Sequence, residues 1–117
     1  MKVIIAGGRK FNDYDLLYKN CDKVLRIKKN EIEIVSGTAN GADKLGERYA
    51  KEKGYPIKQF PANWDKYGKS AGYKRNEEMA KYADGLIAFW DGKSKGTKHM
   101  IDLAKQYELK VKVFIYD

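Results

Sequence analysis

The chain has 117 residues, close to the size of one compact domain, so we expect a single domain over residues 1–117. A hydrophobic content of 43% is enough for a core, and a charged content of 34% indicates a well-solvated surface rather than a disordered chain. The apolar runs are far shorter than the roughly 18 residues of a membrane span, and the start lacks the apolar stretch of a signal peptide. These features predict a cytoplasmic protein with no membrane partner.

The formal net charge of +8 makes nucleic acid a possible partner, because clustered lysines and arginines attract phosphate. The 24 basic residues are scattered, however, with 16 acidic residues between them. The densest run, residues 26–29, falls where a helix should end and where positive side chains complement the helix dipole. We therefore favour a solvated surface over a nucleic-acid interface, and we expect the positive field to attract an anionic small ligand.

Strand and helix signals alternate along the chain and are interrupted by one long loop at residues 61–71. Short apolar runs predict five strands, over residues 2–6, 31–35, 56–60, 84–90 and 110–116. Helical spacing predicts four helices, over residues 13–28, 41–53, 71–82 and 96–107. Pro56 places the short third strand at an edge, whereas the apolar fourth strand should be central. Right-handed crossovers then give an α/β, Rossmann-like doubly wound sheet of mainly parallel strands with helices on both faces.

Two side chains that often carry out chemistry each occur once. Cys21 excludes an internal disulfide, and it shares the apolar helix face of Leu17, Val24 and Leu25, which predicts a packing role. His99 has no carboxylate or nucleophile at an obvious spacing, so a catalytic role is not favoured.

Glycine-rich, polar loops follow three of the predicted strands, at residues 7–9, 36–43 and 91–97. The carboxyl ends of parallel strands form the usual ligand crevice of an open α/β sheet, and neighbouring helix amino termini attract anions. The GxGxxG fingerprint is absent, and the P-loop order is not met because Lys98 follows Thr97. These loops therefore predict an anionic ligand, a nucleotide first, outside the dehydrogenase and P-loop classes.

Each loop offers particular candidates. Gly7 and Gly8 either let a phosphate approach the backbone or form a bare turn, and Arg9 offers planar donors for phosphate or carboxylate. Ser36 could add a hydroxyl donor, and Gly37 and Gly41 leave amides unobstructed.

Other loop residues have competing interpretations. Asp43 is either a helix cap or an acceptor for a ribose hydroxyl. Gly96 and Thr97 open the last predicted helix and give another amide-rich terminus. Asp84 and Asp91 are explained by strand capping and loop solvation, so we predict neither a metal nor a cofactor.

The long segment from residue 61 to residue 79 is rich in aromatic side chains. Trp64, Tyr67 and Tyr73 either cover a base and close a lid or form a small satellite core. Arg75, next to Asn76, either reaches the crevice of the glycine loops or is an ordinary surface arginine.

Several motifs in order resemble the YspA-like branch of the SLOG superfamily, over essentially the whole chain. The segments that carry the resemblance are Gly7-Gly8-Arg9, SGTANGAD, FPANWDKYG, Ala71-Gly72, Arg75-Asn76 with Met79, and ADGLIAFWDGKSKGT. This superfamily has Rossmann-like folds and includes LOG phosphoribohydrolases, the DNA-uptake protein DprA and nucleotide-sensing domains of bacterial defence systems. The resemblance implies a nucleotide or nucleotide-derived ligand over the strand ends. LOG-like relatives are commonly dimers, which makes a homodimer a possible assembly.

The resemblance to LOG enzymes extends to part of their catalytic motif. Their RKxxM segment, apolar strand and PGGxGTxxE are similar to residues 75–79, 86–90 and 93–100. Arg75 and Gly96-Thr97 match, but the catalytic glutamate falls on Met100, which cannot transfer a proton, and the PGG portion is missing. This departure argues against LOG-type hydrolysis. Another acid could substitute, and the spacing does not select among Glu77, Asp43 and Glu47.

Three functions remain, of which we favour the first, a ligand-binding module that senses, sequesters or processes a nucleotide. Its expected contacts are a phosphate and ribose cradle of Gly7, Gly8, Ser36, Gly37, Gly41, Gly96 and Thr97, anion pairing by Arg9 and Arg75 next to Asn76, and a base flanked by Trp90 or Trp64. The second function is an N-glycoside hydrolase or transferase with Arg75 as its candidate catalytic residue. The third is single-stranded DNA binding, as in DprA.

Overall fold

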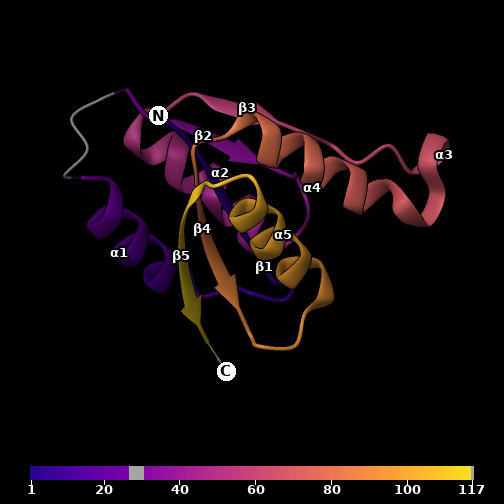
Figure 1. Cartoon of the computed structure of the whole chain (residues 1–117). Coiled ribbons are helices and arrows are strands. Elements are labelled where there is room, and N and C mark those ends of the chain that lie inside the picture. Colours follow the sequence, from indigo (N-terminus) through magenta and orange to yellow (C-terminus); the bar gives the residue numbers. More distant parts are fainter. Residues whose placement is uncertain (27–30, 117) are drawn as a thin grey trace.

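A computed structural model describes residues 1–26 and 31–116. Its five parallel strands form one sheet in the order β3-β2-β1-β4-β5 (Figure 1). The strands are β1 (Lys2–Gly7), β2 (Glu33–Ser36), β3 (Ile57–Gln59), β4 (Gly85–Trp90) and β5 (Lys110–Ile115). The helices are α1 (Tyr14–Leu25), α2 (Ala42–Lys53), α3 (Trp64–Tyr67), α4 (Ala71–Tyr82) and α5 (Lys95–Gln106), with a 3₁₀ turn, η1 (Gly68–Ser70).

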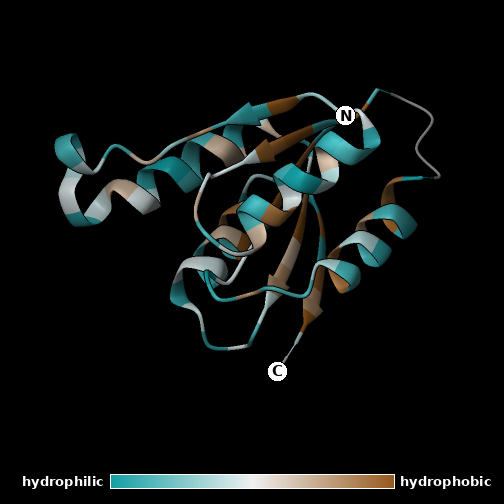
Figure 2. Ribbon diagram, turned by 180° about the vertical axis from the view of Figure 1, so that it is seen from behind, coloured by the Kyte–Doolittle hydropathy of each residue, from teal (hydrophilic) through white to brown (hydrophobic). Residues whose placement is uncertain are grey.

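The interior strands β1 and β4 are buried on both faces, and their side chains alternate between two core clusters. Val3 and Ile5 of β1 belong to a core cluster with α1 and α2, whereas Ile4 and Ala6 belong to a second cluster with α4 and α5. In Figure 2 the central strands are mainly brown, whereas the helices on either side of them are mainly teal. This two-sided cover is what a parallel sheet requires, and it confirms the predicted Rossmann-like doubly wound fold.

The strand order reverses next to β1. The chain moves from β1 through β2 to the edge strand β3, and then crosses to β4 on the other side of β1. The edge position predicted for β3 is confirmed. The predicted interior position of β4 is also confirmed, because β4 lies between β1 and β5, and β1 occupies the middle of the sheet. Such a reversal opens a crevice at the carboxyl ends of the two diverging strands, here β1 and β4.

Most element boundaries follow local signals in the sequence. The Asp13 side chain accepts a hydrogen bond from the Leu16 N–H at 3.1 Å and starts α1. Gly54, with a φ of +77°, ends α2 as predicted. The strand β2 begins at Glu33 rather than at the predicted Glu31. The predicted end of the first helix at residue 28 lies outside the described residues.

The segment predicted as one long loop contains α3 and η1 before α4 begins. The Asn63 side chain accepts a hydrogen bond from the Lys66 N–H at 3.1 Å and caps α3. Helix α3 lies at the outer end of α4, away from the sheet (Figure 1). The packing role predicted for Cys21 fits its full burial, which raises the pKa of its thiol.

Candidate functional site

The loops that follow β1 and β2 pack directly against each other. Gly41 has a φ of +82°, and a Cβ atom there would collide with the carbonyl oxygen of Gly8. The same Gly8 carbonyl accepts the N–H of Ala42 at 3.2 Å, and the Gly8 N–H donates to the carbonyl of Phe89 in β4 at 3.2 Å. These glycines allow the carboxyl ends of three strands to meet at one place.

Arg75 extends from α4 to the loop after β2. Its Nη1 donates a hydrogen bond to the Gly37 carbonyl, and its Nε donates to Asn76 Oδ1 at 3.0 Å. A Cβ atom on Gly37 would stand only 2.9 Å from Nη1 and 2.8 Å from Asp43 Oδ2, so a larger residue there would displace these two side chains. Arg75 therefore reaches the glycine loops and is not an ordinary surface arginine.

The guanidinium of Arg75 has no ion-pair partner among the described residues. Partial burial lowers its pKa, the charge of Asp43 opposes this shift, and the nearby charge of Arg9 adds to it. Asp43 is only 6% exposed, and burial raises the pKa of its carboxyl to about 6. Burial thus disfavours the charged form of Asp43, while Arg75 and Arg9 bring positive charge to the crevice that a bound anion would stabilise.

Asp43 does not act as the amino-terminal cap of α2. The cap position is Gly41, which has no side chain to accept a hydrogen bond. Asp43 instead accepts the N–H of Ala39 at 3.2 Å and holds the loop that precedes its helix. The sequence interpretation as a cap is therefore replaced by a bracing role within the loop, and the proposed role toward a ribose stays a prediction.

The Ser36 side chain is buried, and its hydroxyl is already hydrogen-bonded within the protein. Its hydroxyl donates to Glu47 Oε2 at 2.6 Å and accepts the N–H of Thr38 at 3.0 Å. Gln59 of β3 also donates to Glu47 Oε2, at 3.2 Å, and Ser36 and Glu47 are 1% and 6% exposed. The sequence analysis missed this buried cluster, although Glu47 lies one helical turn after Asp43 on the covered face of α2.

The start of α5 is also partly occupied by its own side chains. Ser94 Oγ accepts the N–H of Thr97 at 3.4 Å and the Thr97 hydroxyl at 3.1 Å. Thr97 is 4% exposed. Its amide is therefore not open to an anion as the sequence suggested, whereas the exposed Gly96 backbone contributes to the crevice wall.

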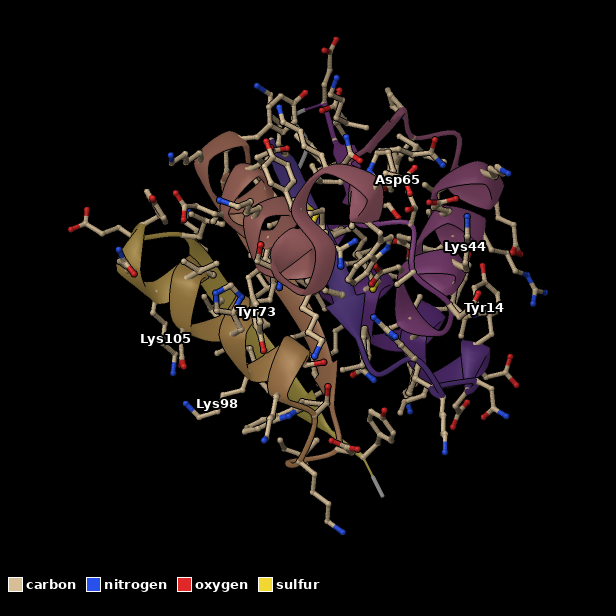
Figure 3. The ribbon with its side chains drawn as sticks, turned by 90° about the vertical axis from the view of Figure 1, so that its right-hand side faces the viewer. Tyr14, Lys44, Asp65, Tyr73, Lys98 and Lys105 are labelled. Carbon is tan, nitrogen blue, oxygen red and sulfur yellow. The ribbon has the colours of Figure 1, made fainter. Side chains whose placement is uncertain are left out.

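Asn76 connects α4 to α5 beside Arg75. Its Nδ2 lies 3.5 Å from the Gly96 carbonyl and 3.2 Å from His99 Nδ1. The His99 ring packs edge-on against Tyr73, with centroids 4.5 Å apart, and Figure 3 shows Tyr73 extending toward α5. Burial lowers the pKa of His99, which favours the neutral ring and an acceptor role toward Asn76. The sequence did not pair these residues because they lie on separate helices.

Arg75 borders several hollows, and it shares three of them with Arg9. The outer hollow, of about 420 Å³, is lined by side chains that include Arg9, Lys10, Trp64, Lys69, Tyr73 and Arg75. A small inner cavity of about 80 Å³ is lined by Gly7, Asp43, Arg75, Asn76, Thr97 and Met100, among others. A side hollow of about 360 Å³ is lined by Arg9, Gly37, Ala39, Ala62, Trp64 and Arg75, among others. Most of the predicted site residues therefore lie around one region, joined by Lys10 and Lys69, which the sequence analysis missed.

Trp90 does not line these three hollows. Its indole Nε1 donates to the Ser94 carbonyl at 3.1 Å, and its ring packs against the core cluster of α4 and α5. Of the two tryptophans expected to flank a base, only Trp64 is placed to do so, with 51% of its surface exposed.

No three His, Cys, Asp or Glu side chains within residues 1–26 and 31–116 lie close enough together to hold a metal ion. In the same part of the chain, no helix is long and apolar enough to cross a membrane.

The fold and the crevice define a class of protein: a Rossmann-like α/β protein with a basic crevice at the reversal of its strand order. Residues 1–67, more than half of the chain, match the YspA, cpYpsA-related SLOG family. The chain is also 32% identical over 111 residues to the gene 61 protein of Mycobacterium phage D29, which covers 90% of this chain and 89% of that protein. The chain belongs to the YspA, cpYpsA-related SLOG family, which confirms the resemblance seen in its motifs.

Proposed function

We propose that the protein binds a nucleotide or a nucleotide-derived small molecule at the carboxyl ends of its strands, as a sensor or as a sequestering or processing module. The position of Arg75 is the observation that supports this most. Its guanidinium is half-buried, is oriented by Gly37 and Asn76, and has no ion pair with any described residue. Such an arrangement suits a phosphate, and the family is consistent with a nucleotide-related function.

The chemistry of the surrounding side chains fits the parts of a nucleotide. The free N–H groups of Arg75, together with Arg9, would bind phosphate oxygens. Trp64 and Tyr73 are 51% and 49% exposed and offer aromatic faces to a base. The glycines allow the loops to lie close together. The buried Ser36 hydroxyl accepts the N–H of Thr38 and stabilises the loop after β2.

Isothermal titration calorimetry with nucleoside mono- and diphosphates of the four common bases tests this proposal. Because hydrogen bonds to charged groups contribute about 1.5–3 kcal/mol, Arg75→Ala should weaken binding roughly tenfold to a hundredfold. Arg48→Ala is a matched control, since Arg48 pairs with Glu52 and stacks on Tyr14, away from the three hollows. No binding of any nucleotide, or equal binding by both variants, would contradict the proposal.

Asp43 favours a second candidate function, the cleavage of an N-glycoside. Met100, at the place of the LOG glutamate, is 1% exposed and packs in the core cluster of α4 and α5. Asp43 lines the inner cavity with Arg75, and its pKa of about 6 gives a carboxyl that is partly protonated near neutral pH, as a general acid requires. Release of free base from nucleoside monophosphates, lost in Asp43→Asn and in Arg75→Ala, would establish this activity. Inactivity toward a broad panel would leave the binding function alone.

A further inference from the structure

The outer hollow and the side hollow share one boundary. Arg9, Trp64 and Arg75 are the residues that line both of them. The outer hollow lies over the ends of β1 and β4, and the side hollow lies between the loop after β2 and residues 61–62. Each has a volume, about 420 Å³ and about 360 Å³, within the usual range of small-molecule sites. The two larger compartments of the crevice therefore meet at two arginines, which also line the small inner cavity.

Positive charge is concentrated at this boundary. The charge of Arg9 disfavours the protonated form of Arg75, so the two guanidinium groups repel each other. Neither arginine forms an ion pair with a described residue. An anion between the compartments would relieve this repulsion, whereas an anion at the far end of either compartment would not.

The walls of both compartments suit groups larger than a phosphate. Trp64 contributes to both, Tyr73 and Tyr116 add aromatic surface to the outer hollow, and Pro61 and Ala62 add apolar surface to the side hollow. Aromatic and apolar surface favours stacking or packing of a nucleoside. A mononucleotide would fill one compartment and leave the other to solvent.

We propose that the ligand is a free dinucleotide, in which two nucleosides are joined through phosphate. The bridging phosphates lie between Arg9 and Arg75, and one nucleoside occupies each hollow. This inference rests on the proposed nucleotide-binding function and specifies its ligand class. A free dinucleotide is favoured over a nucleic-acid strand because the two arginines lie at a single boundary between two compartments, as one bridging group requires.

Calorimetry with diadenosine diphosphate, ADP and AMP, and with the corresponding guanosine, cytidine and uridine series, provides the test. A dinucleotide should bind at least about tenfold more tightly than the mononucleotide of the same base. Ala62→Phe narrows the side hollow without changing the lining of the outer hollow, and it should abolish this gain, so that the mononucleotide and the dinucleotide of one base bind with affinities within about twofold of each other. Tyr73→Ala, in the outer hollow alone, is the matched variant and should weaken a mononucleotide that binds there. The melting temperature of each variant verifies that it is folded.

The outcomes separate this inference from the function on which it rests. Equal affinity for mono- and dinucleotides, or an equal loss of both in Ala62→Phe, overturns the dinucleotide and leaves nucleotide binding standing. Absence of binding by every nucleotide overturns both. Tighter, steeply salt-dependent binding of a ten-residue oligodeoxynucleotide than of any free dinucleotide would identify a strand as the ligand and overturn the inference.

Discussion

Replacing Asp43 by asparagine should stabilise the protein near neutral pH. The carboxyl is 6% exposed, and burial raises its pKa from an ordinary value of 3.8 to about 6. Asparagine keeps an oxygen that can accept the N–H of Ala39 and carries no charge. The substitution therefore removes the cost of a buried carboxylate and preserves its hydrogen bond to the loop.

The size of this effect follows from the two pKa values. At about 1.4 kcal/mol for each tenfold change in proton affinity, the difference between 3.8 and about 6 corresponds to about 3 kcal/mol. Since the folded carboxyl holds its proton more tightly than the unfolded one, the wild-type protein loses this stability as the pH rises from about 4 to about 6. Above that window the cost is constant.

Urea unfolding of the wild type and of Asp43→Asn at about pH 4 and about pH 7 measures this cost, because other titrating groups cancel in the difference between the two proteins. The advantage of the variant should grow by about 2.4 kcal/mol between the two pH values, because the unfolded carboxyl is already partly ionised at pH 4. An advantage that is the same at both values would refute the assignment of a raised pKa to Asp43. A variant that is less stable only near neutral pH would show that the Asp43 charge stabilises the crevice.

Two further predictions concern the fold around the crevice. Gly54→Ala should lower the free energy of unfolding in urea by about 1–2 kcal/mol, because φ is +77° and a Cβ atom there meets no neighbour. Gly41→Ala should lower the free energy of unfolding clearly more, because its Cβ atom would also meet the carbonyl of Gly8. Equal losses of stability would contradict the packing of the two loops. The Cys21 thiol should be unreactive toward a thiol reagent in the folded protein and reactive in urea, because burial raises its pKa and blocks access of the reagent. Rapid labelling of the folded protein would contradict the position of Cys21 in the core.

The sequence was sufficient to predict the sheet and its helices because the relevant signals are local. Buried parallel strands need continuous apolar runs, Pro56 weakened the edge strand, and Gly54 ended a helix. Helix α3 escaped prediction because it has four residues and buries none of them, so that only the Asn63 cap could indicate it. The middle position of β1 depends on the crossover to β4, which no single segment encodes.

The site could be predicted by its loops and less well by its contacts. Arg75 and Gly37 lie 38 positions apart, and their hydrogen bond depends on how α4 docks beside the loop after β2. Ser36 stands in a glycine-rich loop, which favoured a ligand contact, but its hydroxyl donates its hydrogen bond to Glu47 on the next helix. Trp90 was a candidate by its position at the end of β4, but its indole donates a hydrogen bond to the Ser94 carbonyl in the following loop.

A crystal structure of the protein with a bound nucleotide tests the central claim most directly. We expect a phosphate oxygen at about 2.7–2.9 Å from a guanidinium nitrogen of Arg75, with the base in a hollow lined by Trp64. A nucleotide bound elsewhere on the surface, with the Arg75 guanidinium still hydrogen-bonded only to Gly37 and Asn76, would contradict the account.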